Sequence, residues 1–271
     1  MKGDDVTSAL ACVGLAVSDE TELRQLVTRA HQAVRETGVF DGVHAGRWED
    51  DSGAALVLGW RSGELVDFIP AYTAGSGGLL ADCRLVNDEV AVAKVTDTSG
   101  EQLTAMTFTA EQYRELRSHG APVSGPARIT ALGVDVRIYP DADAFAASPG
   151  SQLGTSGDSG EDPPPHYREH GWTWPPRLGA ESFISYGVFD PPAQARPHAR
   201  LSGTVLRAGP RVCALTGQRF TVATVSTAGF AADVCLAASE HPDPPAPGSI
   251  ISGTVSLCAA FTAPLPCCSQ P

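Results

Sequence analysis

The strongest catalytic pattern in the sequence is the pentapeptide at residues 166–170. It reads His-x-x-Glu-His, the inverted zinc-protease motif, in which two histidines hold the metal and the glutamate acts on the metal-bound water. That chemistry needs both histidines on one face of a helix of several turns. Here three prolines precede the motif and Gly171 follows it, so only a very short helix fits. The pattern therefore does not favour a catalytic zinc.

Other common catalytic signatures are missing or incomplete. The sequence has no Gly-x-Ser-x-Gly motif, the commonest serine-hydrolase signal. The glycine-rich run at residues 75–78 lacks the lysine and the helix that complete a phosphate loop. Asp50 and Asp51 lie in a turn-like stretch, where a solvated hairpin turn explains them better than acid–base chemistry. We therefore expect no cofactor, and a binding protein rather than an enzyme.

The seven cysteines are scattered and odd in number. No secretory signal is recognisable and no apolar run has the length of a membrane span, so we expect free thiols, a cytoplasmic location and no membrane contact. Cys83 and Cys213 lie in strand-like segments and are predicted to be small buried side chains. Cys267 and Cys268 lie in the tail, where a redox role is the alternative to a frayed end.

Four residues are the main candidates for binding. Trp172 and Trp174 precede two prolines and could form an aromatic patch for a ligand or a proline-rich peptide. The alternative is that they fix a linker onto the adjoining domain by burying large apolar area. Arg219 and Phe220 lie on a strand-like segment and could belong to a basic, aromatic face of the kind that binds single-stranded nucleic acid.

The charge distribution disfavours nucleic acid as a partner. The net charge is −12, and residues 1–150 hold 22 acidic against 12 basic side chains, whereas residues 151–271 hold 9 against 7. A nucleic-acid-binding surface needs a basic footprint to neutralise phosphates. The acidity is explained better as a means of keeping the protein soluble.

The pattern of expected helices and strands changes at residues 148–180, a stretch rich in Pro, Gly and Ser. Residues 1–147 mix helix and strand patterns, which predicts an α+β domain. Residues 181–263 show only short strands separated by turns, which predicts a small antiparallel barrel. Residues 264–271 are expected to be a flexible tail.

Within the first domain the expected order is strand, helix and three strands. A strand is predicted over residues 7–17, and a helix follows the N-cap candidates Ser18 and Asp19. The next three strands are expected over residues 43–48, 54–60 and 65–72.

Four segments carry a resemblance that spans nearly the whole chain: EDDSGAALVL at residues 49–58, SFISYGVFDP at residues 182–191, LTGQRF at residues 215–220 and IISGTV at residues 250–255. In these segments the chain resembles a bacterial, mainly actinobacterial, family of two-domain proteins with no assigned activity. The resemblance implies an αβ front half and a β back half, and it implies no chemistry.

Residues 12–72 resemble the βαβββ unit of the vicinal oxygen chelate proteins, the glyoxalase and dioxygenase group. The matching positions are those of the first-strand pattern and of the later glycine turn: Cys12, Leu15, Val17, Asp19 and residues 50–54. The resemblance implies a concave sheet. In the catalytic members a His and a Glu bind the metal where this chain has Cys12 and Val57. Valine has no donor atom and a thiolate suits softer metals, so Cys12 is the one remaining metal-ligand candidate.

Together these observations predict an α+β protein of two domains, in which an αβ domain with a vicinal-oxygen-chelate-like sheet is followed by a small, OB-like antiparallel β-barrel. The interpretation we favour is a non-enzymatic cytoplasmic protein that binds a protein partner or a small ligand. One alternative is a degenerate glyoxalase-like metalloenzyme that uses Cys12. The other is a single-stranded nucleic-acid binder that uses Arg219 and Phe220.

Overall fold

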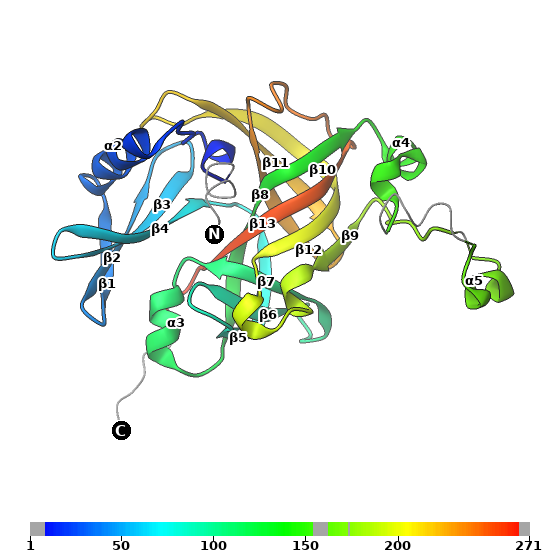
Figure 1. The fold of residues 1–271 in the computed structure, drawn as a ribbon, viewed down its shortest axis with the longest axis horizontal. Helices are drawn as coiled ribbons and strands as arrows, with labels where there is room; N and C mark the ends of the chain where they lie inside the picture. The colour runs from blue at the N-terminus through cyan, green and yellow to red at the C-terminus, as the bar shows by residue number, and fades with distance from the viewer. Residues whose placement is uncertain (1–8, 154–161, 173, 266–271) are drawn as a thin grey trace.

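The computed structural model describes residues 9–153, 162–172 and 174–265 and combines two β-sheets with short helices (Figure 1). The chain is α+β, and most of its regular structure is sheet. The small sheet has four antiparallel strands in chain order, β1 (Arg35–Phe40), β2 (Val43–Glu49), β3 (Ala54–Arg61) and β4 (Glu64–Tyr72). The large sheet has nine strands, β5 (Gly77–Leu85), β6 (Val90–Thr96), β7 (Gln102–Ala110), β8 (Val123–Tyr139), β9 (Ser182–Ser185), β10 (His198–Val212), β11 (Arg219–Thr227), β12 (Phe230–Ala237) and β13 (Ile250–Phe261).

The helix predicted after residue 19 is present as α2 (Glu20–His31), and local chemistry explains where it starts. Asp19 is the N-cap, and its carboxylate accepts a hydrogen bond from the Glu22 N–H at 2.8 Å. The Glu22 carboxylate accepts in turn from the Ser18 N–H at 2.8 Å. The face that α2 buries has the expected helical spacing, with Leu26, Val27 and Ala30.

The prediction of a strand over residues 7–17 is wrong for residues 9–17, the part that the structure describes. Residues 9–12 are helical, and Gly14 ends the helix with φ 70°. The Leu15 N–H donates to the Leu10 carbonyl and the Gly14 N–H to the Ala11 carbonyl, which is a Schellman termination. Most side chains of the segment are apolar and buried, so no alternation distinguishes helix from strand in the sequence. The first strand of the expected βαβββ unit is therefore replaced by a helical turn.

The small sheet lies between two layers. One apolar cluster joins β3 to α2 and to residues 9–15, and another joins β3 and β4 to the large sheet. As a result six of the eight β3 residues are buried. The structure also adds β1, which the sequence analysis did not predict, because that strand is mostly exposed and has no apolar alternation.

The large sheet closes into two rings that share β8 and β13. These two strands form an antiparallel ladder that runs from the pair Tyr139–Ile250 to the pair Ala127–Phe261. On one side, β12, β11 and β10 connect β8 back to β13. On the other side, β5, β6 and β7 also connect β8 to β13. Closure leaves few free strand edges in the large sheet.

The two halves of the sequence are therefore interleaved in one sheet. β8 precedes the stretch at residues 148–180, whereas its partners β12 and β13 follow it. The barrel expected from residues 181–263 closes only when β8 is included. In its described part, the stretch at residues 148–180 does not separate two sheets. It carries the short helix α5 (Pro165–His170), which lies away from both sheets in Figure 1.

This interleaving predicts that neither half folds alone. Fragments 1–153 and 162–271 each lack strands that close both rings, so each should show no cooperative thermal unfolding by circular dichroism. The control is the intact chain carrying a protease site between residues 153 and 162, cleaved after folding. Its two pieces should stay associated and unfold in one transition. Cooperative unfolding of either isolated fragment would contradict the shared-strand architecture.

Candidate functional site

A groove of about 540 Å³ lies where the small sheet, the start of α2 and the large sheet meet. The large sheet contributes Thr109 at the end of β7 and Glu89 just before β6. The volume lies within the range of ligand-binding pockets in proteins. The apolar part of the lining consists of Leu10, Val17, Leu23, Leu65, Val66, Phe68, Ile69 and Pro70.

The groove runs along the free edge of β4. All six residues from Leu65 to Pro70 line it. Because consecutive strand residues point to opposite faces, a groove that contacts six in a row follows the edge of the strand and not one face. β4 is an edge strand, and the described residues place no further strand beside it. Pro70 is compatible with this position, because an edge strand is hydrogen-bonded on one side only.

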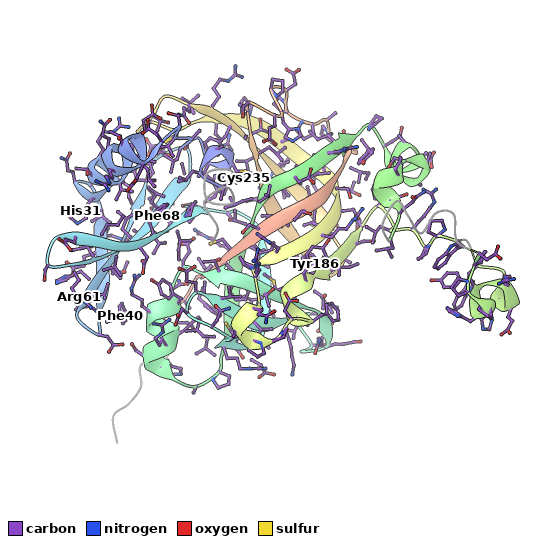
Figure 2. All side chains as sticks on the ribbon, in the orientation of Figure 1. His31, Phe40, Arg61, Phe68, Tyr186 and Cys235 are labelled. Carbon is purple, nitrogen blue, oxygen red and sulfur yellow. The ribbon has the colours of Figure 1, made fainter. Side chains whose placement is uncertain are left out.

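Unusual exposure marks the same edge. Val66 is 51% exposed and Leu65 46% exposed, although both are large and apolar. Phe68, labelled in Figure 2 on β4, is half-buried in the same lining. An exposed apolar strand edge offers unpaired backbone groups together with hydrophobic area, the combination that another extended chain can cover.

A buried ion pair fixes one wall of the groove. The Arg114 guanidinium from α3 (Tyr113–His119) binds the Asp67 carboxylate of β4, which also accepts a hydrogen bond from the Tyr113 hydroxyl at 2.7 Å. Burial, with a further contribution from Asp67, raises the pKa of Tyr113 above its usual value, so the phenol stays a donor. Space for Arg114 exists because residue 59 is glycine: a Cβ there would lie 2.0 Å from the guanidinium.

A second ion pair joins the two sheets beside this wall. Arg47 of β2 donates through Nε to the Glu111 carboxylate at 2.7 Å and also pairs with Glu49. The Glu111 side chain is only 7% exposed. Breaking such a buried pair is costly, since the remaining charge is left without a partner. The two pairs therefore hold β2 and β4 in fixed positions against the segment 110–119.

The rim of the groove is acidic. Asp19, Glu20, Asp67 and Glu89 all line it. Asp19 caps α2, Glu20 pairs with Arg24 and Asp67 pairs with Arg114. Among the described residues the Glu89 carboxylate has no hydrogen-bond or ion-pair partner, and Glu89 also borders two neighbouring hollows of about 330 and 410 Å³. The groove thus favours an apolar occupant that carries positive charge or hydrogen-bond donors.

The predicted tryptophans lie together, outside this groove. The Tyr167 ring of α5 contacts both Trp172 and Trp174 edge to face, with ring centroids 5.6 and 4.9 Å apart. The Trp172 ring stacks on His170 at 4.8 Å and is 59% exposed. The indole N–H of Trp174 is buried and has no partner among the described residues. The described ring contacts of the two tryptophans are therefore to Tyr167 and His170 of α5 and not to an aromatic residue of either sheet.

Phe220 and Arg219 do not join the tryptophans. Phe220 is fully buried, and its ring packs edge to face on Tyr72 with centroids 6.2 Å apart. A buried ring offers no surface on which a base could stack. Arg219 is exposed at the start of β11. The four predicted binding residues thus do not form one site.

Cys12 is placed where a metal ligand is not expected. It is 1% exposed, and its thiol donates to the Gly133 carbonyl with Sγ and O 3.3 Å apart. Burial, and to a lesser extent the charge of Glu240, raises the pKa of Cys12 to about 12. Since metals bind the thiolate, a thiol of this kind is a poor ligand at neutral pH. Within the described ranges, no group of three or more His, Cys, Asp or Glu could hold a metal ion. Cys267 and Cys268 lie outside the described residues.

The sequence contains one local signal for the groove. The run Leu65-Val66-Asp67-Phe68-Ile69-Pro70 has apolar residues on both faces and a proline within the strand. That combination indicates an edge strand with apolar residues on its exposed side. The residues that complete the groove come from segments far apart in the chain, which local patterns cannot bring together.

Comparison with known proteins gave no match: no family model, no curated protein and no solved structure is similar to the chain. None of the helices in the described part has the length and apolar character that a membrane crossing requires.

The buried thiols predict a loss of stability at alkaline pH. All five described cysteines are buried, and burial raises the pKa of Cys12 and of Cys83 from 9.0 to about 12. Between pH 9 and 12 these thiols ionise in the unfolded chain but not in the folded one. The unfolded state then binds fewer protons, so the free energy of unfolding falls, by up to about 1.4 kcal/mol per pH unit for each thiol.

Urea unfolding under reducing conditions at pH 8 to 10.5 measures this slope. Cys12→Ala should lower stability at every pH through its cavity, but should reduce the alkaline slope by one thiol. Comparison with the wild type cancels the contribution of every other titrating group. An unchanged slope would mean that the Cys12 thiol ionises in the folded protein, against the buried geometry.

Proposed function

We propose that this chain is a non-enzymatic binding protein that holds an extended, apolar segment of a partner protein along β4. The observation that carries the proposal is the row of six consecutive β4 residues lining the groove. A strand of six residues spans about 20 Å, enough for a partner strand to pair with the free edge. Main-chain hydrogen bonds would supply affinity, and the apolar lining would select the side chains.

The acidic rim specifies the partner further. Glu89 is not neutralised by any described residue, so a segment with Lys or Arg beside its apolar core is favoured over an acidic one. The two ion pairs that fix the walls of the groove also support the binding of a partner segment. A groove whose shape is already set by buried ion pairs requires less ordering on binding.

The two alternatives drawn from the sequence gain less support. A metalloenzyme would need Cys12 as a thiolate, and an OB-like nucleic-acid binder would need Phe220 on the surface. We also propose that the ring of β8 and β10–β13 is OB-like, and that residues 12–72 correspond to the vicinal-oxygen-chelate unit with a helical turn in place of its first strand. Membership of the mainly actinobacterial family also remains a proposal.

Selection from a library of random peptides tests the function. Peptides enriched on the full chain should carry β-branched apolar cores flanked by Lys or Arg, and fluorescence anisotropy then gives their affinity. Val66→Lys places a charge on the exposed edge and should weaken binding about tenfold or more, or by at least ~1.4 kcal/mol. On binding, the amides of residues 64–72 should become protected from hydrogen exchange.

Val39→Lys is the matched control. Val39 is 54% exposed on β1, the opposite edge strand of the same sheet, so this variant should bind like the wild type. Equal effects of the two substitutions, or a selection that enriches no peptide, would contradict the proposal. A neutral apolar dye such as Nile red tests whether the groove binds a small ligand instead. If the dye binds, Val66→Lys abolishes that binding and no peptide binds, the groove is a site for a small ligand.

A further inference from the structure

A second, polar hollow of about 180 Å³ lies on the other part of the molecule, over the strands β8, β13 and β10. Figure 1 shows these three strands side by side, near α4 (Ala142–Ala147). Gly150, in the loop that follows α4, also lines the hollow. The rest of the lining comes from the strands: Asp135, Arg137, Tyr139, Arg200, Ser252, Gly253 and Thr254.

Strand register places the polar side chains on one face. Arg137 pairs with Ser252 on the shared ladder, and Thr254 pairs with both Asp135 of β8 and Arg200 of β10. Directly paired residues, and residues two apart along a strand, project from the same side of a sheet. Two guanidinium groups and two hydroxyl groups therefore converge from three strands.

Several of these polar groups lack a partner. Arg200 Nε and the Ser252 hydroxyl are buried and make no hydrogen bond with any described residue. Ser252 is only 4% exposed. Arg137 and Asp135 are exposed at the mouth of the hollow; the Arg137 guanidinium takes part in no hydrogen bond or ion pair within the described residues, and Asp135 forms no salt bridge with either arginine. Buried polar groups are nearly always satisfied, so such atoms indicate an occupant.

The half-buried side chain of Arg200 is held in place by the loop that contains Gly150. Arg200 donates through Nη2 to the Gly150 carbonyl at 2.7 Å. Arg177 fixes the same loop by donating to the Ala146 carbonyl at 2.6 Å and to the Ser151 hydroxyl at 2.7 Å. The Arg200 guanidinium is thereby oriented, with its Nε still available.

We infer that this hollow is a binding site for the phosphate group of a small molecule. Two arginines against one aspartate give the site a positive balance in a chain of net charge −12. Guanidinium groups bind oxyanions through paired hydrogen bonds. Donors that arrive from three strands suit the tetrahedral arrangement of phosphate oxygens better than a planar carboxylate. A water occupies about 30 Å³, so a hollow of about 180 Å³ has room for one phosphate group and for part of the small molecule that carries it.

Isothermal titration calorimetry of the full chain with inorganic phosphate tests the site, with sodium chloride holding the ionic strength constant. We expect saturable binding of one phosphate. Arg200→Gln and Arg137→Gln should each weaken it about tenfold or more. Ser252→Ala should also weaken it without lowering the melting temperature, because the hydroxyl makes no hydrogen bond to the protein.

Arg84→Gln is the control, an exposed arginine on β5 outside the hollow, and should leave phosphate binding unchanged. Two results would overturn the inference. Acetate binding in place of phosphate would make this a carboxylate site. No anion binding, or binding that the three variants of the hollow leave intact, would mean that water alone satisfies Arg200 and Ser252. The groove along β4 plays no part in this measurement.

Discussion

The ladder between β8 and β13 is the constraint on which the rest of the structure depends. Each strand belongs to both rings of the large sheet, so neither ring closes unless residues 123–139 meet residues 250–261. More than one hundred residues separate the two strands in the chain. Loop-closure entropy grows only slowly with such length, so the equilibrium cost is modest, whereas non-local pairing of this kind slows folding.

The small sheet takes its position from this ladder through segment 110–119. That segment follows β7, whose end pairs with β13, and it carries Glu111, Tyr113 and Arg114. Arg47 and Asp67 of the small sheet bind these side chains. Buried ion pairs add little net stability, because desolvation offsets their attraction. Their effect here is geometric, since they fix the edge of β4 at one distance from Thr109 and Glu89 and so define the groove.

Local chemistry predicted most elements but not their assembly. The N-cap at Asp19 and the strand-like segments at residues 43–48, 54–60 and 65–72 are visible in the sequence, and the elements that they predict are present. The helical turn at residues 9–12 was missed because a buried apolar run lacks a distinguishing period, although Gly14 was available as a helix stop. The pairing of β8 with β12 and β13 depends on tertiary register, which no local pattern encodes. The same limit hid both candidate sites, since each is assembled from distant segments. It also explains why Phe220 was misassigned to a binding face, since it is buried in an apolar cluster built from distant segments.

The two candidate sites are joined by one rigid strand. Ser252 and Thr254 of β13 line the polar hollow, while Cys258, further along β13, pairs with Thr109 at the groove. Coupling between sites requires an element with two arrangements whose balance each ligand shifts. β13 is hydrogen-bonded along its length to β8 and over its first half to β10, and a register slip by one residue would turn its buried face outward. A strand held in this way has one arrangement. Under the two proposals, occupation of the hollow should therefore leave binding at the β4 edge unchanged, and charged hydrogen bonds at one site and strand pairing at the other would act independently on one scaffold.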